Sequence, residues 1–144
     1  MKKILCLICL LSVFLSGCDP RVLPVSQTKN DIEQIELLYS SVPDVLLEDM
    51  VVLCTLTDAD ADSVWDALQK ITVEKHFSAP PSYCGQLVVS IHYKNGGNDI
   101  LGTGICLYEY NGRTHYNNYY YLNFEETHEL FSKWGLEDNT LAPQ

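Results

Sequence analysis

Three aspartates at alternate positions, Asp58, Asp60 and Asp62, have a spacing that could bind a metal ion. Alternating acids open a common type of Ca²⁺-binding loop, which continues with a glycine and ends on a bidentate glutamate. Here Ser63 stands in place of the glycine and Gln69 in place of the glutamate. The acids fall instead in the first turn of a predicted helix, where the helix dipole favours negative charge. We therefore predict no metal site.

The sequence holds no complete motif for catalysis. His128-Glu129 begins the H-E-x-x-H pattern of zinc proteases, but Ser132 stands where the second histidine is needed. The four histidines are isolated from one another, and no G-x-S-x-G, phosphate-binding loop or dinucleotide-binding glycine pattern is present. No nucleophile, base and orienting group can be assembled. We therefore predict that the protein is not an enzyme and needs no cofactor.

A cluster of tyrosines is the feature that best suggests binding. The chain has nine tyrosines, and most of them fall between residues 108 and 121. Tyrosine is enriched in interfaces because it combines a large contact area with a polar tip. The alternative is that a helix covers this face and the tyrosines are core residues. The predicted binding residues are Tyr108, Tyr110, His115, Tyr119 and Tyr121.

Hydrophobic periodicity predicts the elements that would position these tyrosines. The predicted strands are residues 32–39, 50–57 (mostly buried), 86–94, 99–110 and 113–122. The predicted helices are residues 58–71 and 124–134. We therefore predict an α+β fold with the order β-β-α-β-β-β-α. Its antiparallel sheet is a three-stranded meander plus one or two N-terminal strands, with two helices on one face.

The register of the meander follows from matching apolar sets. A three-residue loop over 96–98 puts Val89 opposite Ile105, whereas a two- or four-residue loop would put it opposite Gly104. We predict the first. With a two-residue turn at Asn111-Gly112, Tyr119 and Tyr121 then stand across from strand glycines, on the face opposite the apolar one.

The N-terminal residues predict the cellular location of the protein. Two lysines precede an apolar run over 4–14, followed by Leu15-Ser16-Gly17-Cys18. The run would span about 16 Å as a helix, too short for a bilayer core of about 30 Å, and the pattern is that of a secretory signal peptide. The last four residues resemble the lipobox of bacterial lipoproteins. This resemblance implies cleavage before Cys18, diacylation of its thiol and a firm membrane anchor.

The residue after the lipidated cysteine implies which membrane is used. In enteric-type Gram-negative bacteria, an aspartate such as Asp19 resembles the signal that keeps a lipoprotein in the inner membrane, facing the periplasm. In a host with one membrane, the domain would face outward. We predict a cleaved signal over 1–17, a lipidated cysteine and flexible spacer over 18–30, one domain over 31–136 and a disordered tail over 137–144.

Charge limits the partners. Without residues 1–17 the chain has 127 residues, 7 of them basic and 19 acidic, for a net charge of −12. Such a charge argues against nucleic acid as a partner and is compatible either with a basic protein partner or with solubility alone. An exported location permits one disulfide, or none, among Cys54, Cys84 and Cys106.

These observations predict a membrane-tethered binding protein without catalysis. It would recognise another envelope protein through the Tyr-rich sheet face, as an inhibitor or immunity-type factor. One alternative is a lipoprotein that binds a sugar or peptide on the same tyrosines. Others are a structural component of the envelope and an enzyme with a site scattered along the chain.

Overall fold

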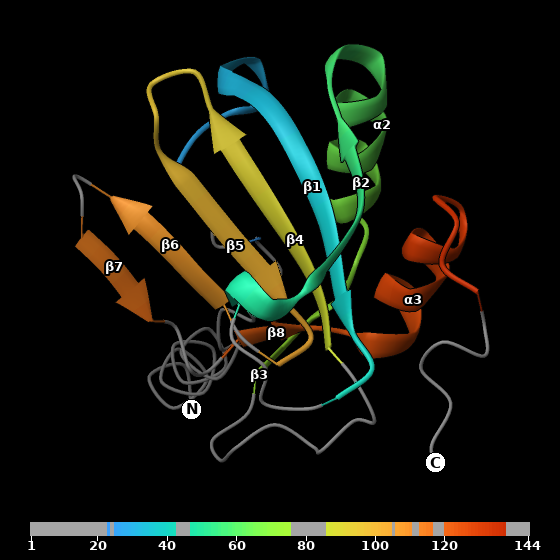
Figure 1. Ribbon diagram of the computed structural model, residues 1–144. Coiled ribbons are helices and arrows are strands. Elements are labelled where there is room, and N and C mark those ends of the chain that lie inside the picture. The colour runs from blue at the N-terminus through green and yellow to red at the C-terminus, as the bar shows by residue number, and fades with distance from the viewer. Residues whose placement is uncertain are drawn as a thin grey trace, which may run out of the picture.

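The computed structural model in Figure 1 describes residues 23, 25–42, 47–75, 86–104, 106–110, 113–116 and 120–137, with the backbone alone at 75, 106–110, 113–116 and 120. In chain order, the elements are η1 (Lys29–Asp31), β1 (Ile32–Ser40), η2 (Leu47–Asp49), β2 (Val51–Leu56), α2 (Asp58–Leu68), β3 (Val73–Lys75), β4 (Gln86–Tyr93), β5 (Asn98–Gly102), β6 (Cys106–Tyr110), β7 (Arg113–Tyr116), β8 (Tyr120–Leu122) and α3 (Phe124–Ser132).

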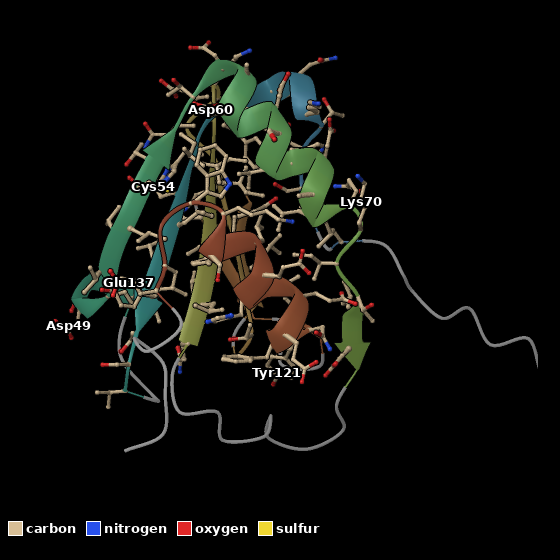
Figure 2. All side chains as sticks on the ribbon, turned by 90° about the vertical axis from the view of Figure 1, so that its right-hand side faces the viewer. Asp49, Cys54, Asp60, Lys70, Tyr121 and Glu137 are labelled. Atoms are coloured by element: carbon tan, nitrogen blue, oxygen red, sulfur yellow. The ribbon has the colours of Figure 1, made fainter. Side chains whose placement is uncertain are left out.

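Six strands form one antiparallel sheet in the order β2-β1-β4-β5-β6-β7, while β3 pairs with β8 in a small second sheet. α2 packs against β1 and α3 against β4, so both helices lie on the same face of the large sheet (Figure 1, Figure 2). We call this the inner face. The predicted α+β class, with an antiparallel sheet and two helices, is confirmed.

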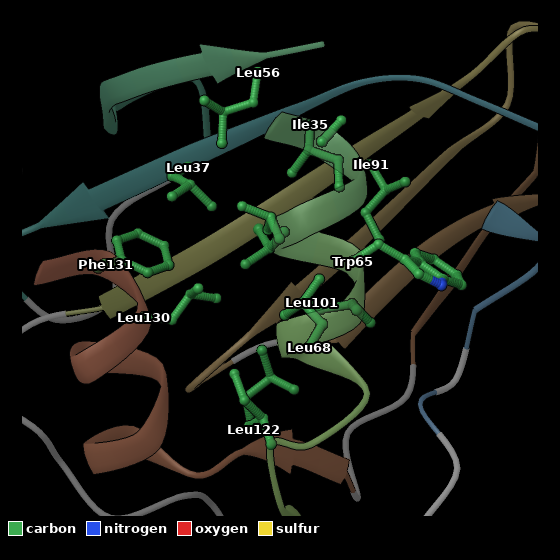
Figure 3. Close-up of a cluster of buried hydrophobic side chains, with 14 of the residues drawn as sticks. Ile35, Leu37, Leu56, Trp65, Leu68, Ile91, Leu101, Leu122, Leu130 and Phe131 are labelled. Carbon is green, nitrogen blue, oxygen red and sulfur yellow. The ribbon is translucent and has the colours of Figure 1, made fainter. Parts of the chain in front are cut away.

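The core lies between the inner face and the two helices (Figure 3). Alternate residues of β1 and β4 point into it, as the period of two requires. α2 buries one stripe at helical spacing, and α3 contributes Phe131, which is 0% exposed. Fully burying such a side chain stabilises the fold by about 1.5–3 kcal/mol. The central members are Ile35, Leu37, Leu87, Val89, Ile91, Val64, Leu68 and Phe131.

Residues 99–110, predicted as one strand, form two. β5 ends at Gly102 and β6 begins at Cys106. Glycine weakens the interior of a strand and often marks a bend. The Thr103 N–H donates to the Leu87 carbonyl at 3.0 Å, and the Thr103 hydroxyl accepts from the Leu87 N–H at 3.2 Å. These bonds hold the start of the turn against β4, and the meander therefore has four strands rather than three.

The register between β4 and β5 also differs from the prediction. Val89 pairs with Leu101, not with Ile105. The hairpin closes earlier because the Gly96 N–H donates to the Tyr93 carbonyl at 2.8 Å. Gly96 has a φ of +81°, a conformation that glycine adopts without strain. The shift is an even number of residues, so Leu101 still lies on the inner face.

In β6, by contrast, the positions predicted for the inner face belong to the outer face, and those predicted for the outer face belong to the inner face. Its register with β7 is as predicted, with Leu107 opposite Tyr116. However, β6 pairs with β5 so that Tyr108 stands opposite Asp99. Cross-strand partners share a face, and Asp99 lies on the same face as Leu101. The position of Tyr108 therefore belongs to the inner face, whereas the prediction placed it on the other.

β2 is an edge strand, not the mostly buried strand that its composition predicts. Among the described strands it pairs with β1 alone, and Val51 and Val52 are 52% and 49% exposed. An apolar, β-branched run fits an edge as well as a centre, because strand propensity depends on context.

The predicted flexible spacer over 18–30 is wrong for its second half. Leu23 is 4% exposed and belongs to the main core, with Val25 packed against it. The Ser26 N–H donates to the Asp99 carboxylate at 2.5 Å. The folded domain therefore begins near residue 23, because a few apolar residues and one buried carboxylate fix this segment. Residues 1–22 and 138–144 lie outside the described residues.

Candidate binding surface

The face of the large sheet opposite the helices, here called the outer face, has two unlike halves. Its lower half in Figure 1 lies behind the turn that carries η2, and the side chains there form an apolar cluster. Its upper half is polar, and no helix or strand of the described chain lies over it in Figure 1. Leu38, Met50 and Val88 form the apolar half, with Leu47 and Ile100 packed against them.

The polar half holds a connected set of side chains from three strands, which we call the polar cluster. Its centre is a hydrogen-bonded contact between His92 and Glu36, with His92 Nε2 at 3.1 Å from Glu36 Oε2. Ser90 Oγ lies 3.2 Å from the same ring nitrogen and donates to Asn98 Oδ1 at 3.1 Å. Gln34 Nε2 lies 3.5 Å from Glu36 Oε1.

Neighbouring strands bring the cluster together by register. Gln34 pairs with His92, and Glu36 pairs with Ser90, across β1 and β4. His92 in turn pairs with Asn98 of β5. The side chains of Glu36 and His92 are 26% and 32% exposed, so the pair is half-buried and open to a partner.

This arrangement is suited to recognition rather than to nucleophilic catalysis. In a catalytic triad the acid orients one ring nitrogen and the other ring nitrogen accepts the serine proton. Here Glu36 and Ser90 both contact Nε2 of His92, so one nitrogen would have to serve both. Ser90 is also 3% exposed. The exposed parts of the cluster can instead donate and accept hydrogen bonds and present a carboxylate.

A second polar group, on the inner face, is closed to solvent. Asp99 is 0% exposed and accepts from the Tyr93 hydroxyl at 2.7 Å as well as from the Ser26 N–H. The other carboxylate oxygen, Oδ1, has no hydrogen-bond partner among the described residues. Burial, and then the bond to Asp99, raises the pKa of Tyr93 far above its ordinary value. The group fixes the N-terminal segment to the sheet.

A small cleft lies between the end of α2 and α3. Its volume is about 280 Å³, at the lower limit for ligand sites. Two lysines and two glutamates line it, so their charges offset, and Lys133 is already paired with Glu129 at 3.0 Å. The cleft therefore offers no convergent set of groups. Its lining is Ala67, Lys70, Ile71, Glu126, Glu129, Leu130 and Lys133.

Of the predicted binding residues, Tyr121 alone has a side chain that the structure describes. Tyr108, Tyr110 and His115 are described by their backbone alone, and Tyr108 pairs with His115 and with Asp99, at inner-face positions. Tyr121 lies in β8, pairs with Glu74 and is 4% exposed, so it does not stand across from a glycine of the meander. Tyr119 and Cys18 lie outside the described residues.

The polar cluster was not found from the sequence. Glu36 and His92 each occupy a position between the apolar residues of an alternating strand, which places them on the face opposite the core, and the sequence carries no signal that joins them. Their pairing joins residues 56 positions apart, and it depends on β1 lying beside β4. Cys54, on β2, is a free thiol whose pKa is raised by burial, and Cys84 lies outside the described residues.

Two searches of the described residues and three comparisons give no further site. No group of three or more metal-ligating side chains occurs among the described residues. No helix in that part of the chain is long and apolar enough to span a bilayer. No known protein family, curated protein or solved structure matches the chain.

Proposed function

We propose that this chain is a membrane-tethered lipoprotein of the bacterial envelope that binds another envelope protein without catalysing a reaction, as an inhibitor or immunity-type factor. The observation that carries the proposal is the half-exposed Glu36–His92 pair, on a half of the sheet over which no described helix or strand lies. Its hydrogen-bonding geometry fits recognition and does not fit a nucleophile.

A tether at Cys18 would hold the domain close to the membrane. Lipidation of Cys18 is the proposed anchor, and the packed chain begins at Leu23. Five residue steps span at most about 17 Å. A partner is therefore an integral or peripheral membrane protein, or a soluble protein that reaches the membrane surface.

Charge favours a basic partner. The processed chain carries a net charge of −12, and the exposed acids of the domain greatly outnumber its lysines. Such a field steers a basic protein toward the domain and repels acidic ones. Lysine-rich or arginine-rich envelope proteins, including secreted hydrolases and toxins, have the matching chemistry.

The anchor is tested by Cys18→Ser in the full-length chain. The unchanged protein should fractionate with membranes and incorporate radiolabelled palmitate, and the variant should do neither. A variant that still labels with palmitate would contradict lipidation at Cys18.

The surface is tested by crosslinking in intact envelopes, followed by purification of the adducts. Glu36→Lys should reduce recovery of a basic partner at least tenfold. Glu125→Lys is the matched control, because it makes the same charge change on an exposed residue of α3. Circular dichroism melts establish that both variants fold. Equal recovery with both variants would show that the outer face is not the binding surface.

The small-ligand alternative is separated from this proposal by thermal-shift measurements. A sugar or peptide that raises the melting temperature of the full-length protein would favour it. A protein partner recovered by crosslinking, with no ligand effect, favours the proposal.

A further inference from the structure

β2 is an unprotected edge with an apolar middle. It stands at the left margin of Figure 2, and it pairs with β1 alone among the described strands. An edge strand presents a row of unpaired backbone N–H and C=O groups that another chain can use. The strand reads Val-Val-Leu-Cys-Thr-Leu, and its first two side chains are about half exposed.

Most of the usual protections of an edge are missing here. Natural edges are guarded by lysine, proline, inward-pointing charge, bulges or a covering element. β2 contains no charged residue and no proline, and no described helix or strand pairs with its free side. One bulge is present, because the register shifts between Leu37 and Leu38 of β1. The bulge limits the ladder to a short segment and does not remove the edge.

Acidic residues stand at both ends of this apolar strand. Glu48 and Asp49 precede it, and Asp58 and Asp60 follow it, all of them exposed. Asp49 and Asp60 mark the two ends of β2 in Figure 2. The edge therefore has a negative end, an apolar middle and a second negative end.

We propose that β2 binds an extended segment of a basic protein by strand addition. The segment has alternating apolar residues in its middle and lysine or arginine at both ends. Main-chain hydrogen bonds supply the affinity and the alternating side chains supply the specificity. The proposal rests on the proposed binding function and names the element that docks the partner.

The added strand would extend the same outer face that carries the polar cluster. Thr55 of β2 pairs with Glu36, and Val52 pairs with Leu38, so both lie on the outer face. Every second side chain of the added strand would stand next to them. A partner docked on β2 would therefore reach the polar cluster through its neighbouring residues.

Charge argues against a second copy as the occupant. In an antiparallel pair of two β2 strands, the acids before one strand would stand beside the acids after the other. Like charges placed opposite one another across strands are destabilising, and each processed chain carries a net charge of −12. A basic segment meets the same acids with opposite charge.

The test uses the full-length lipoprotein in detergent and a fluorescent peptide, Lys-Lys-Val-Thr-Val-Thr-Val-Lys-Lys. Anisotropy measures its Kd. Glutamate in place of the lysines should weaken binding at least tenfold. N-methylation of two adjacent central residues, which blocks both edges of the peptide, should do the same.

Variants of the protein locate the site. Val52→Lys should weaken binding of the lysine-flanked peptide at least tenfold. Val42→Lys is the matched control, since Val42 is 57% exposed and lies outside β2, and it should bind within twofold of the unchanged protein. Melting curves establish that both variants fold.

Three results would overturn strand addition on β2: no peptide binding, equal binding of the N-methylated peptide, or equal binding by Val52→Lys. A fourth is sedimentation of the unchanged protein as a dimer that Val52→Lys converts to a monomer, because the occupant would then be a second copy. If strand addition fails while Glu36→Lys still abolishes the envelope partner, the proposed function stands without this edge.

Discussion

The two faces of β1 and β4 carry opposite kinds of side chain on the same backbone. On the inner face, Ile35, Leu37 and Val89 are 0% exposed and pack against the helices. On the outer face, Glu36 and His92 form a half-exposed hydrogen-bonded pair. Because side chains alternate along a strand, adjacent residues can belong to the core and to a recognition surface. Stability and the proposed recognition therefore depend on different residues of the same strands.

The largest loss of stability is expected from a substitution at Leu37, on the inner face. Leu37→Ala should lower the free energy of unfolding by about 2–5 kcal/mol, because it removes buried methyl groups and leaves a cavity. Urea unfolding, followed by circular dichroism, measures it. A loss below about 1 kcal/mol would show that the inner face is not the stabilising one.

A smaller loss is expected at the buried polar group of the inner face. Tyr93→Phe removes one of two donors to the buried Asp99 carboxylate, which should cost about 1.5–3 kcal/mol near neutral pH.

This loss should depend on pH. Burial and the bond to Asp99 raise the pKa of Tyr93, so the folded protein holds the proton more tightly than the unfolded chain. The stabilisation is fully present below the ordinary tyrosine pKa of about 10 and is lost above it, by about 1.4 kcal/mol per pH unit. The difference in unfolding free energy between the unchanged protein and Tyr93→Phe should therefore be smaller at pH 11 than at pH 8, as measured from unfolding curves. A gap that widens with pH would contradict the assignment.

The smallest effect is expected on the outer face. Glu36→Gln removes the carboxylate from the half-exposed Glu36–His92 contact, and even an ion pair at such a site contributes only about 0–1 kcal/mol. The unfolding free energy should therefore change by less than about 1 kcal/mol, measured beside Leu37→Ala in the same experiment. A larger loss would mean that the polar cluster is part of the stabilising core, and the separation of the two faces would fail.

Local patterns predicted most of the elements but not how the strands of the meander meet. The alternation over 32–39 and 86–94 and the helical spacing around Trp65 are properties of short windows, and the structure confirms them. The bend after Gly102 was missed, although two nearby glycines were a signal for it. The chain reverses direction at that bend, so β6 pairs with β5. The position of Tyr108 then lies on the inner face and not on the predicted outer face.

The candidate site was the part least open to prediction. The tyrosines were chosen for their residue type, and the strand register then placed the position of Tyr108 on the inner face. Glu36 and His92 could not be joined from the sequence, because nothing local specifies that β1 pairs with β4. The exposure of Val51 and Val52 likewise depends on which strand forms the edge of the sheet.

The sequence by itself determined which side of β1, β4 and the two helices is buried, because the apolar residues of these elements follow the backbone period. It did not determine this for β2 or β6. It also determined the expected lipid address at Cys18 and the net negative charge. Only the tertiary structure decided strand order and register, because these depend on long-range backbone pairing and on where the chain turns. Strand order and register produced the polar cluster and, among the described strands, the free edge at β2. Long-range packing also placed Leu23 in the core, which leaves the proposed tether short.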